Sequence, residues 1–276
     1  MAKKETTILV FSLPLSLLVI GVSCIGLLTP DFYSRESMNW QAQSIGQDLI
    51  DLSVIIPVLL MSAAIAYRGH SLARMIWAGV NVYLVYTFAI YAFDVHFNSV
   101  FLFYCICLGL AFYSVIYFFY TEWIHPGNAL TIQKPLSRII GLYFIVTAFL
   151  FYGLWLSDVL IAMFYNEPAV SLKDINLPTN PVHVIDLSVI LPALVIAGIL
   201  ILKRHPLGFL LAPVMLTFTL LMNITIAGLN VVMLKKGFEA SWMITACMLV
   251  LAAFSLSLLT KLNKSTRPIQ TTTHVI

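Results

Sequence analysis

The stretch IDLSVIIP at residues 50–57 returns as IDLSVILP at residues 185–192, with seven of eight positions identical and the two aspartates 135 residues apart (186 − 51). Apolar identities are common in a hydrophobic chain, but an aspartate, a serine and a proline that recur in register indicate internal duplication. The repeated stretch therefore predicts two related units and marks a site to which both contribute.

The composition predicts that both stretches lie in membrane-spanning helices. Of the 276 residues, 61% are hydrophobic and only 10% are charged, and the mean hydropathy is +0.96. So few charges cannot cover a soluble globule of this size. A spanning helix needs roughly 20 mainly apolar residues. Eight such runs occur, near residues 7–28, 47–67, 75–94, 99–121, 139–164, 182–202, 207–232 and 240–260.

The distribution of lysine and arginine predicts the orientation. With the N-terminus in the cytoplasm, eleven of the fifteen basic residues fall in inner segments. They are Lys3, Lys4, Arg68, Arg74, Lys134, Arg138, Lys203, Arg204, Lys261, Lys264 and Arg267. We therefore expect a multi-pass protein of the cell membrane with both termini cytoplasmic. The expected partner of this chain is the lipid bilayer, and no nucleic acid is expected.

These features together predict an all-α integral membrane protein. Its eight transmembrane helices are expected to form two parallel four-helix repeats around a pseudo-twofold axis along the membrane normal. The first repeat is expected at residues 1–121, a cytoplasmic linker at 122–137, and the second repeat with a short cytoplasmic tail at 138–276. Each repeat has a long outer loop after its first span, at 29–46 and 165–181. Homo- and hetero-oligomers both remain open.

The repeated helices carry paired ionisable residues. Asp48 and Asp51 are three apart, and His183 and Asp186 hold the same two positions in the second copy, so each pair projects from one face. If the second and sixth spans are neighbours, Asp51, His183 and Asp186 form a tentative metal set. A divalent cation or protons are then the candidate cofactors. A purely structural role near the helix N-terminus also remains open, although charge in a bilayer favours a site.

Three more polar residues join the expected binding set. Pro57 and Pro192 lack the amide that would bond the carbonyls of Ser53 and Ser188, so each helix is expected to be interrupted beside these serines. In the seventh span, Asn223 lies on a polar stripe, where it either joins helices or contacts a ligand.

We therefore expect transport or binding of a small solute or cation in an outward-facing cavity lined by paired acids. The expected substrate-binding residues are Asp48, Asp51, Ser53, His183, Asp186, Ser188 and Asn223. Two alternatives remain, a membrane-embedded metal-dependent enzyme acting on a lipid-type substrate and a non-catalytic membrane scaffold or assembly partner. No residue is assigned a catalytic role. The chain has no glycine-rich phosphate loop, no H-E-x-x-H and no G-x-S-x-G, which disfavours an ATP-driven pump.

Overall fold

The computed structural model describes residues 2–124, 131–173, 177–238 and 240–265, and it is helical with no strand in these ranges. The helices are α1 (Ala2–Leu28), α2 (Met38–Ile50), η1 (Asp51–Ile55), α3 (Ile56–Tyr67), α4 (Ser71–Asp94), α5 (Phe101–Ile124), α6 (Lys134–Tyr165), α7 (Val170–Lys173), α8 (Pro181–Ile185), η2 (Asp186–Ile190), α9 (Leu191–Leu202), α10 (Pro206–Lys235) and α11 (Trp242–Ser265). Arg267, the middle of the expected linker (125–130) and the C-terminal tail lie outside the described residues.

The eight expected spans are confirmed. Within the described ranges, eight helical segments are long and apolar enough to cross a membrane. Two of them begin well before the predicted start. The second begins at Met38, inside the expected outer loop, because the Ser37 side chain accepts a hydrogen bond from the Trp40 amide (3.2 Å) and caps the helix there. The fifth begins at Lys134 rather than near residue 139.

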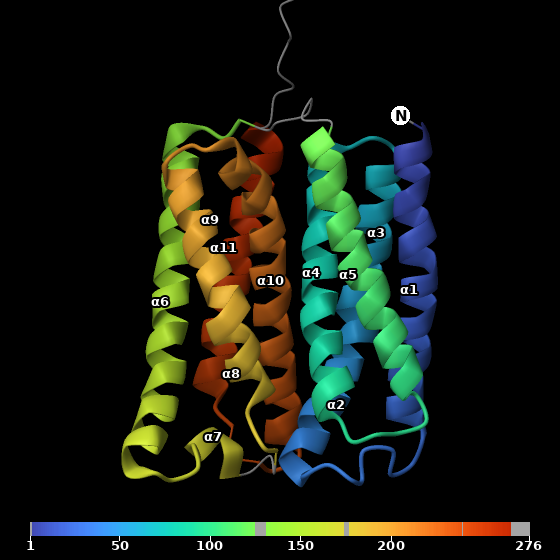
Figure 1. Cartoon of the computed structure of the whole chain (residues 1–276), viewed down its shortest axis with the longest axis vertical. Coiled ribbons are helices and arrows are strands. Elements are labelled where there is room, and N and C mark those ends of the chain that lie inside the picture. Colours follow the sequence, from blue (N-terminus) through green and yellow to red (C-terminus); the bar gives the residue numbers. More distant parts are fainter. Residues whose placement is uncertain (1, 125–130, 174–176, 239, 266–276) are drawn as a thin grey trace, which may run out of the picture.

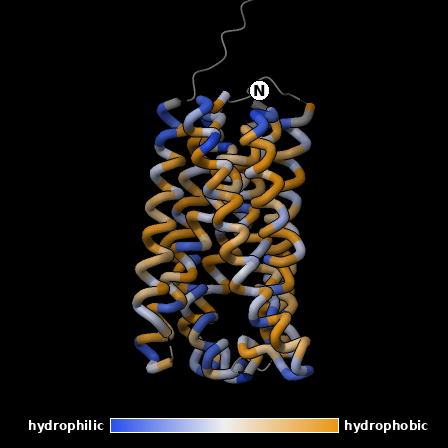
Figure 2. Tube along the Cα trace, turned by 90° about the vertical axis from the view of Figure 1, so that its left-hand side faces the viewer, coloured by the Kyte–Doolittle hydropathy of each residue, from blue (hydrophilic) through white to orange (hydrophobic). Residues whose placement is uncertain are grey.

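The helices stand side by side in two groups (Figure 1). Helices α1 to α5 form one group and α6 to α11 the other, and the start of α1 and the end of α11 lie at the same end of the bundle. Hydrophobic residues dominate the length of the helices, while hydrophilic residues gather at the two ends (Figure 2). The groups meet where α10 packs against α2 and α4, and where α4 contacts α8.

Both copies of the repeated sequence DLSVI form a π-helical turn. In η1 the Ile56 amide bonds the Asp51 carbonyl, and in η2 the Leu191 amide bonds the Asp186 carbonyl. The expected interruptions before the two prolines take this form. A wider turn relieves the clash between a proline ring and the carbonyl four residues earlier, which a regular helix would force.

Glycines allow the two groups to approach closely. A Cβ added at Gly79 of α4 would lie 2.5 Å from the Val214 carbonyl oxygen and 2.6 Å from Thr217 Cβ, both on α10. A Cβ at Gly228 of α10 would lie 2.6 Å from Ile50 Cδ1 at the end of α2. Small residues at such contacts bring helix backbones together, which is the usual basis of helix association in membranes.

Candidate functional site

A cavity of about 630 Å³ lies between the two groups of helices. It is lined by most of α2, the last turns of α4, the middle of α6, the second half of α10, the first turns of α11, and the region from α7 to α9. It therefore occupies the half of the bundle farther from the N-terminus (Figure 1). The walls are mainly apolar and aromatic, as is usual for sites that take small organic molecules.

Asp186 is the only acidic residue among the described residues that line the cavity, and no lysine, arginine or histidine lines it there. Its side chain is buried and accepts a hydrogen bond from Trp155 Nε1 to Oδ2 (2.9 Å). Within the described ranges, no basic side chain comes within 4.0 Å of this carboxylate. A buried carboxylate without a cation is costly, so this wall of the cavity favours a positively charged occupant.

Two buried donors that line the cavity have no hydrogen-bond partner in the described part of the chain. They are the Trp40 indole N–H and the Asn223 side-chain amide. The Tyr86 hydroxyl, in contrast, lies beside the Asp186 carboxylate and interacts with it. Buried polar groups are almost always paired, so the two unpaired donors point to a ligand with acceptor atoms.

Asp51 lies behind the cavity wall and reaches the cavity only through a neighbour. Gln47 Nε2 donates to Asp51 Oδ1 and to Tyr83 Oη, each at 2.8 Å, and Tyr83 shares a hydrogen bond of 2.7 Å with Thr225 Oγ1. Gln47 and Thr225 line the cavity, whereas Asp51 and Tyr83 do not. This network joins α2, α4 and α10, so it connects the first group of helices to the second.

Asp48 is held within the first group of helices. Its two oxygens accept hydrogen bonds from Tyr33 Oη (2.7 Å) and Tyr91 Oη (3.1 Å). A Cβ at Gly26 would collide with both Asp48 Oδ2 and the Tyr33 hydroxyl, so the absence of a side chain there makes room for the pair. Burial, reinforced by the nearby Asp48 carboxylate, raises the pKa of Tyr33 well above its ordinary value, so this hydroxyl stays protonated and donates.

His183 and the two repeated serines do not line the cavity. The His183 ring lies against Trp155, with ring centroids 4.5 Å apart. Ser53 and Ser188 are exposed on the outside of the bundle, and each donates to the carbonyl four residues earlier in its own helix. Of the seven residues expected to bind substrate, Asp186 and Asn223 line the cavity, and the other five do not.

The expected metal ligands have separate surroundings. Asp51 bonds Gln47 of α2, whereas Asp186 accepts from Trp155 of α6, so the two carboxylates have different hydrogen-bond partners. Within the described ranges, no three histidine, cysteine, aspartate or glutamate side chains are grouped closely enough to hold a metal ion.

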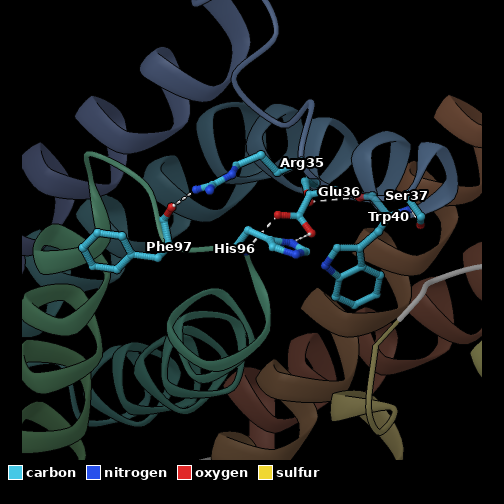
Figure 3. Close-up of polar contacts among 7 residues, drawn as sticks. Arg35, Glu36, Ser37, Trp40, His96 and Phe97 are labelled. Carbon is cyan, nitrogen blue, oxygen red and sulfur yellow. Dashed lines mark hydrogen bonds and ion pairs between the residues drawn. The ribbon is translucent and has the colours of Figure 1, made fainter.

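The segment before α2 and the segment after α4 are bonded to each other beside the cavity (Figure 3). Glu36, before α2, accepts hydrogen bonds from the His96 amide (2.8 Å), and its other oxygen lies 3.0 Å from His96 Nδ1. Arg35 Nη1 donates to the Phe97 carbonyl (2.8 Å). These bonds lie next to Trp40 and Val95, which line the cavity, so they fix one edge of its rim.

Several cavity residues were not expected from the sequence. Trp155 and Tyr86 resemble ordinary aromatic residues of a membrane span, and Trp40 fits an interfacial position. Gln47 carried a usable signal, because it stands one helical turn before Asp51. Gln47 is the first residue of the expected second span, so this spacing could be read from the sequence.

No protein-family model matches the chain, and comparison with curated proteins and with solved structures gives no match. Inferences about function therefore rest on the site itself.

Proposed function

We propose that this chain is a membrane protein that binds and transports a small organic cation, and that Asp186 supplies the counter-charge. The observation that carries the proposal is the position of Asp186, which is the lone acid among the described cavity-lining residues and has no basic partner there. A cation bound beside it would offset the cost of burying the carboxylate.

The aromatic walls support an organic cation rather than a bare metal ion. Trp155, Tyr86 and Phe218 all line the cavity that contains Asp186. Aromatic faces attract ammonium groups, and the attraction grows when water is excluded. A hard metal ion needs several oxygen ligands at close range instead, and one carboxylate among apolar walls does not supply them. The unpaired donors of Trp40 and Asn223 suit an ether, carbonyl or hydroxyl oxygen on the same solute.

We further propose that the chain is a tandem duplication with units at 1–121 and 138–276, joined by a linker at 122–137, and related by a pseudo-twofold axis. The repeated sequence DLSVI and its π-helical turn in both copies support this. The positive-inside bias supports cytoplasmic termini, and the cavity would then open on the outer side of the membrane. In this proposal Asp51 positions Gln47 in the cavity wall, and Asp48 anchors Tyr33 and Tyr91.

Binding of tetraethylammonium to protein in lipid nanodiscs tests the proposal. We expect this cation to raise the unfolding temperature and its neutral isostere, tetraethylmethane, to have no effect. Asp186→Asn should lower the affinity for tetraethylammonium at least tenfold. Asp31→Asn is the matched control, because Asp31 is an exposed acid that does not line the cavity, and asparagine tolerates its positive φ of 57°.

Uptake of radiolabelled tetraethylammonium into proteoliposomes then tests transport. The parent and Asp31→Asn should accumulate the cation, and Asp186→Asn should not. Equal binding and uptake by the parent and by a folded Asp186→Asn variant would overturn the assignment of Asp186. Binding without uptake in the parent would leave a cation-binding protein and overturn transport.

A further inference from the structure

The cavity has an open side between α6 and α11. Leu154 of α6 and Ile244 of α11 both line it, and their exposed fractions are 55% and 45%. Deeper lining residues such as Phe218 and Thr225 are buried. Residues that line a cavity and are also half exposed lie at its edge, so the wall is incomplete where these two helices face each other.

The inner halves of α6 and α11 are in contact, which locates the opening along their length. Tyr143 shares a hydrogen bond of 2.7 Å with Ser255, and its ring packs on Phe254 at 5.2 Å. Leu154 is eleven residues after Tyr143, and Ile244 is eleven residues before Ser255 (154 − 143 and 255 − 244). At about 1.5 Å per residue, the exposed cavity residues lie roughly 16 Å from this contact.

The equivalent pair of helices in the first group is more tightly packed. Helices α1 and α5 pack together more extensively than α6 and α11 do. Their contact includes the rings of Phe11 and Tyr117, with centroids 6.0 Å apart. The looser of the two contacts is therefore the one between α6 and α11.

The surface around the opening suits lipid rather than water. Leu154 and Ile244 belong to segments apolar enough to span a membrane. Neighbouring Met243 and Trp242 are also largely exposed, and a tryptophan at the start of a spanning helix is typical of the boundary between acyl chains and headgroups. A molecule that reaches the opening comes from the outer part of the bilayer.

We infer that the cavity takes a single-chain amphipathic amine that enters from the bilayer between α6 and α11. This inference rests on the proposed function of Asp186 and names its ligand class. The ammonium group would lie at Asp186, and the alkyl chain would lie along the apolar wall that includes Met248 and ends at Leu154 and Ile244. A volume of about 630 Å³ is in the usual range for one drug-sized molecule.

The charges of the cavity exclude anionic amphiphiles. Among the described lining residues there is no lysine, arginine or histidine to pair with a phosphate, sulfate or carboxylate group. Such a group would also lie close to the Asp186 carboxylate. An unpaired buried charge beside a like charge is strongly unfavourable. The site is therefore expected to select amines from among bilayer amphiphiles.

Stopped-flow binding to protein in nanodiscs tests this access route, with decyltrimethylammonium, decyl sulfate and tetraethylammonium as probes. We expect decyltrimethylammonium to bind more tightly than tetraethylammonium and decyl sulfate not to bind. The double variant Leu154→Trp, Ile244→Trp fills the opening and should slow the association of decyltrimethylammonium at least tenfold. Tetraethylammonium should associate at the parent rate, because it enters from water at the polar end of the cavity, where Asn39 and Asn180 lie.

Two further variants complete the design. Val250→Trp adds the same bulk to an exposed position of α11 that does not line the cavity, and it should behave as the parent. Leu154→Ala, Ile244→Ala widens the opening and should speed association of decyltrimethylammonium, which keeps the test decisive if the tryptophan variant does not fold.

The outcomes separate the two proposals. Parent-like rates for decyltrimethylammonium in both the narrowed and the widened variants would overturn lateral access and leave cation binding at Asp186 intact. Equal binding of decyl sulfate would overturn the ligand class. If the parent protein does not bind tetraethylammonium, the proposed function itself is overturned.

Discussion

Trp155 Nε1 donates a hydrogen bond of 2.9 Å to Asp186 Oδ2, so an indole of α6 holds the repeated aspartate of η2 in the cavity wall. The same indole lies against the His183 ring. One side chain thus contacts both Asp186 and His183. In the first motif Asp51 is held instead by Gln47, which belongs to the same helical segment.

Trp155→Phe is expected to weaken the fold through this bond. Phenylalanine keeps an aromatic ring beside His183 but removes the donor to a buried carboxylate, which costs about 1–3 kcal/mol. We expect the free energy of unfolding, measured by titration with sodium dodecyl sulfate in mixed micelles, to fall by that amount. Trp242→Phe is the matched control, because Trp242 is 65% exposed. Equal losses in the two variants would show that the bond to Asp186 contributes nothing.

Tyr33→Phe is expected to destabilise the protein at neutral pH by about 1–3 kcal/mol, because Asp48 then keeps only Tyr91 as a phenol donor. The effect depends on pH. The pKa of Tyr33 is raised in the folded protein, whereas in the unfolded chain it is about 10. The stability from this shift is therefore fully present below the unfolded pKa and is lost as the pH rises above it.

The measurement is the unfolding free energy of the parent and of Tyr33→Phe from neutral pH to about pH 11, across the ordinary tyrosine pKa. The parent should lose more stability than the variant over the alkaline part of this range, so their difference should shrink. Tyr120→Phe, at an exposed position, should follow the parent. A difference that grows with pH would contradict the assigned direction of the pKa shift.

The spans could be predicted from the sequence because a long apolar run has few alternatives to a membrane helix. The site could be predicted only in part. Gln47 stands three residues before the first IDLSVI stretch, and Val182 stands three residues before the second. Gln47 can bond Asp51 one turn away, but valine cannot bond Asp186, so Asp186 takes a partner from α6. Which helix supplies that partner depends on packing, and the repeated motif carries no information about it.

Arg74 and Glu122 form a buried ion pair between the start of α4 and the end of α5, with Arg74 Nε 2.9 Å from Glu122 Oε1. Glu122→Met would leave the guanidinium without its counter-charge, which typically costs about 3–5 kcal/mol. Arg74→Met, Glu122→Met should cost clearly less than the two single changes added together, because it leaves no unpaired charge. A double-mutant cycle of unfolding free energies measures this, and additive losses would mean that the pair is not coupled.

Gly79→Ala is expected to separate α4 from α10, because the added Cβ would meet the Val214 carbonyl oxygen and Thr217 Cβ within 2.6 Å. Both contacts involve backbone or its first side-chain atom, so the helices themselves must shift, at a cost of about 1–3 kcal/mol. Gly109→Ala is the matched control in α5, where an added Cβ meets nothing within 4 Å. Since α4 and α10 both line the cavity, Gly79→Ala should also weaken tetraethylammonium binding. A variant that loses neither stability nor affinity would mean that the two helices can move apart freely, and that their close contact does not set the shape of the cavity.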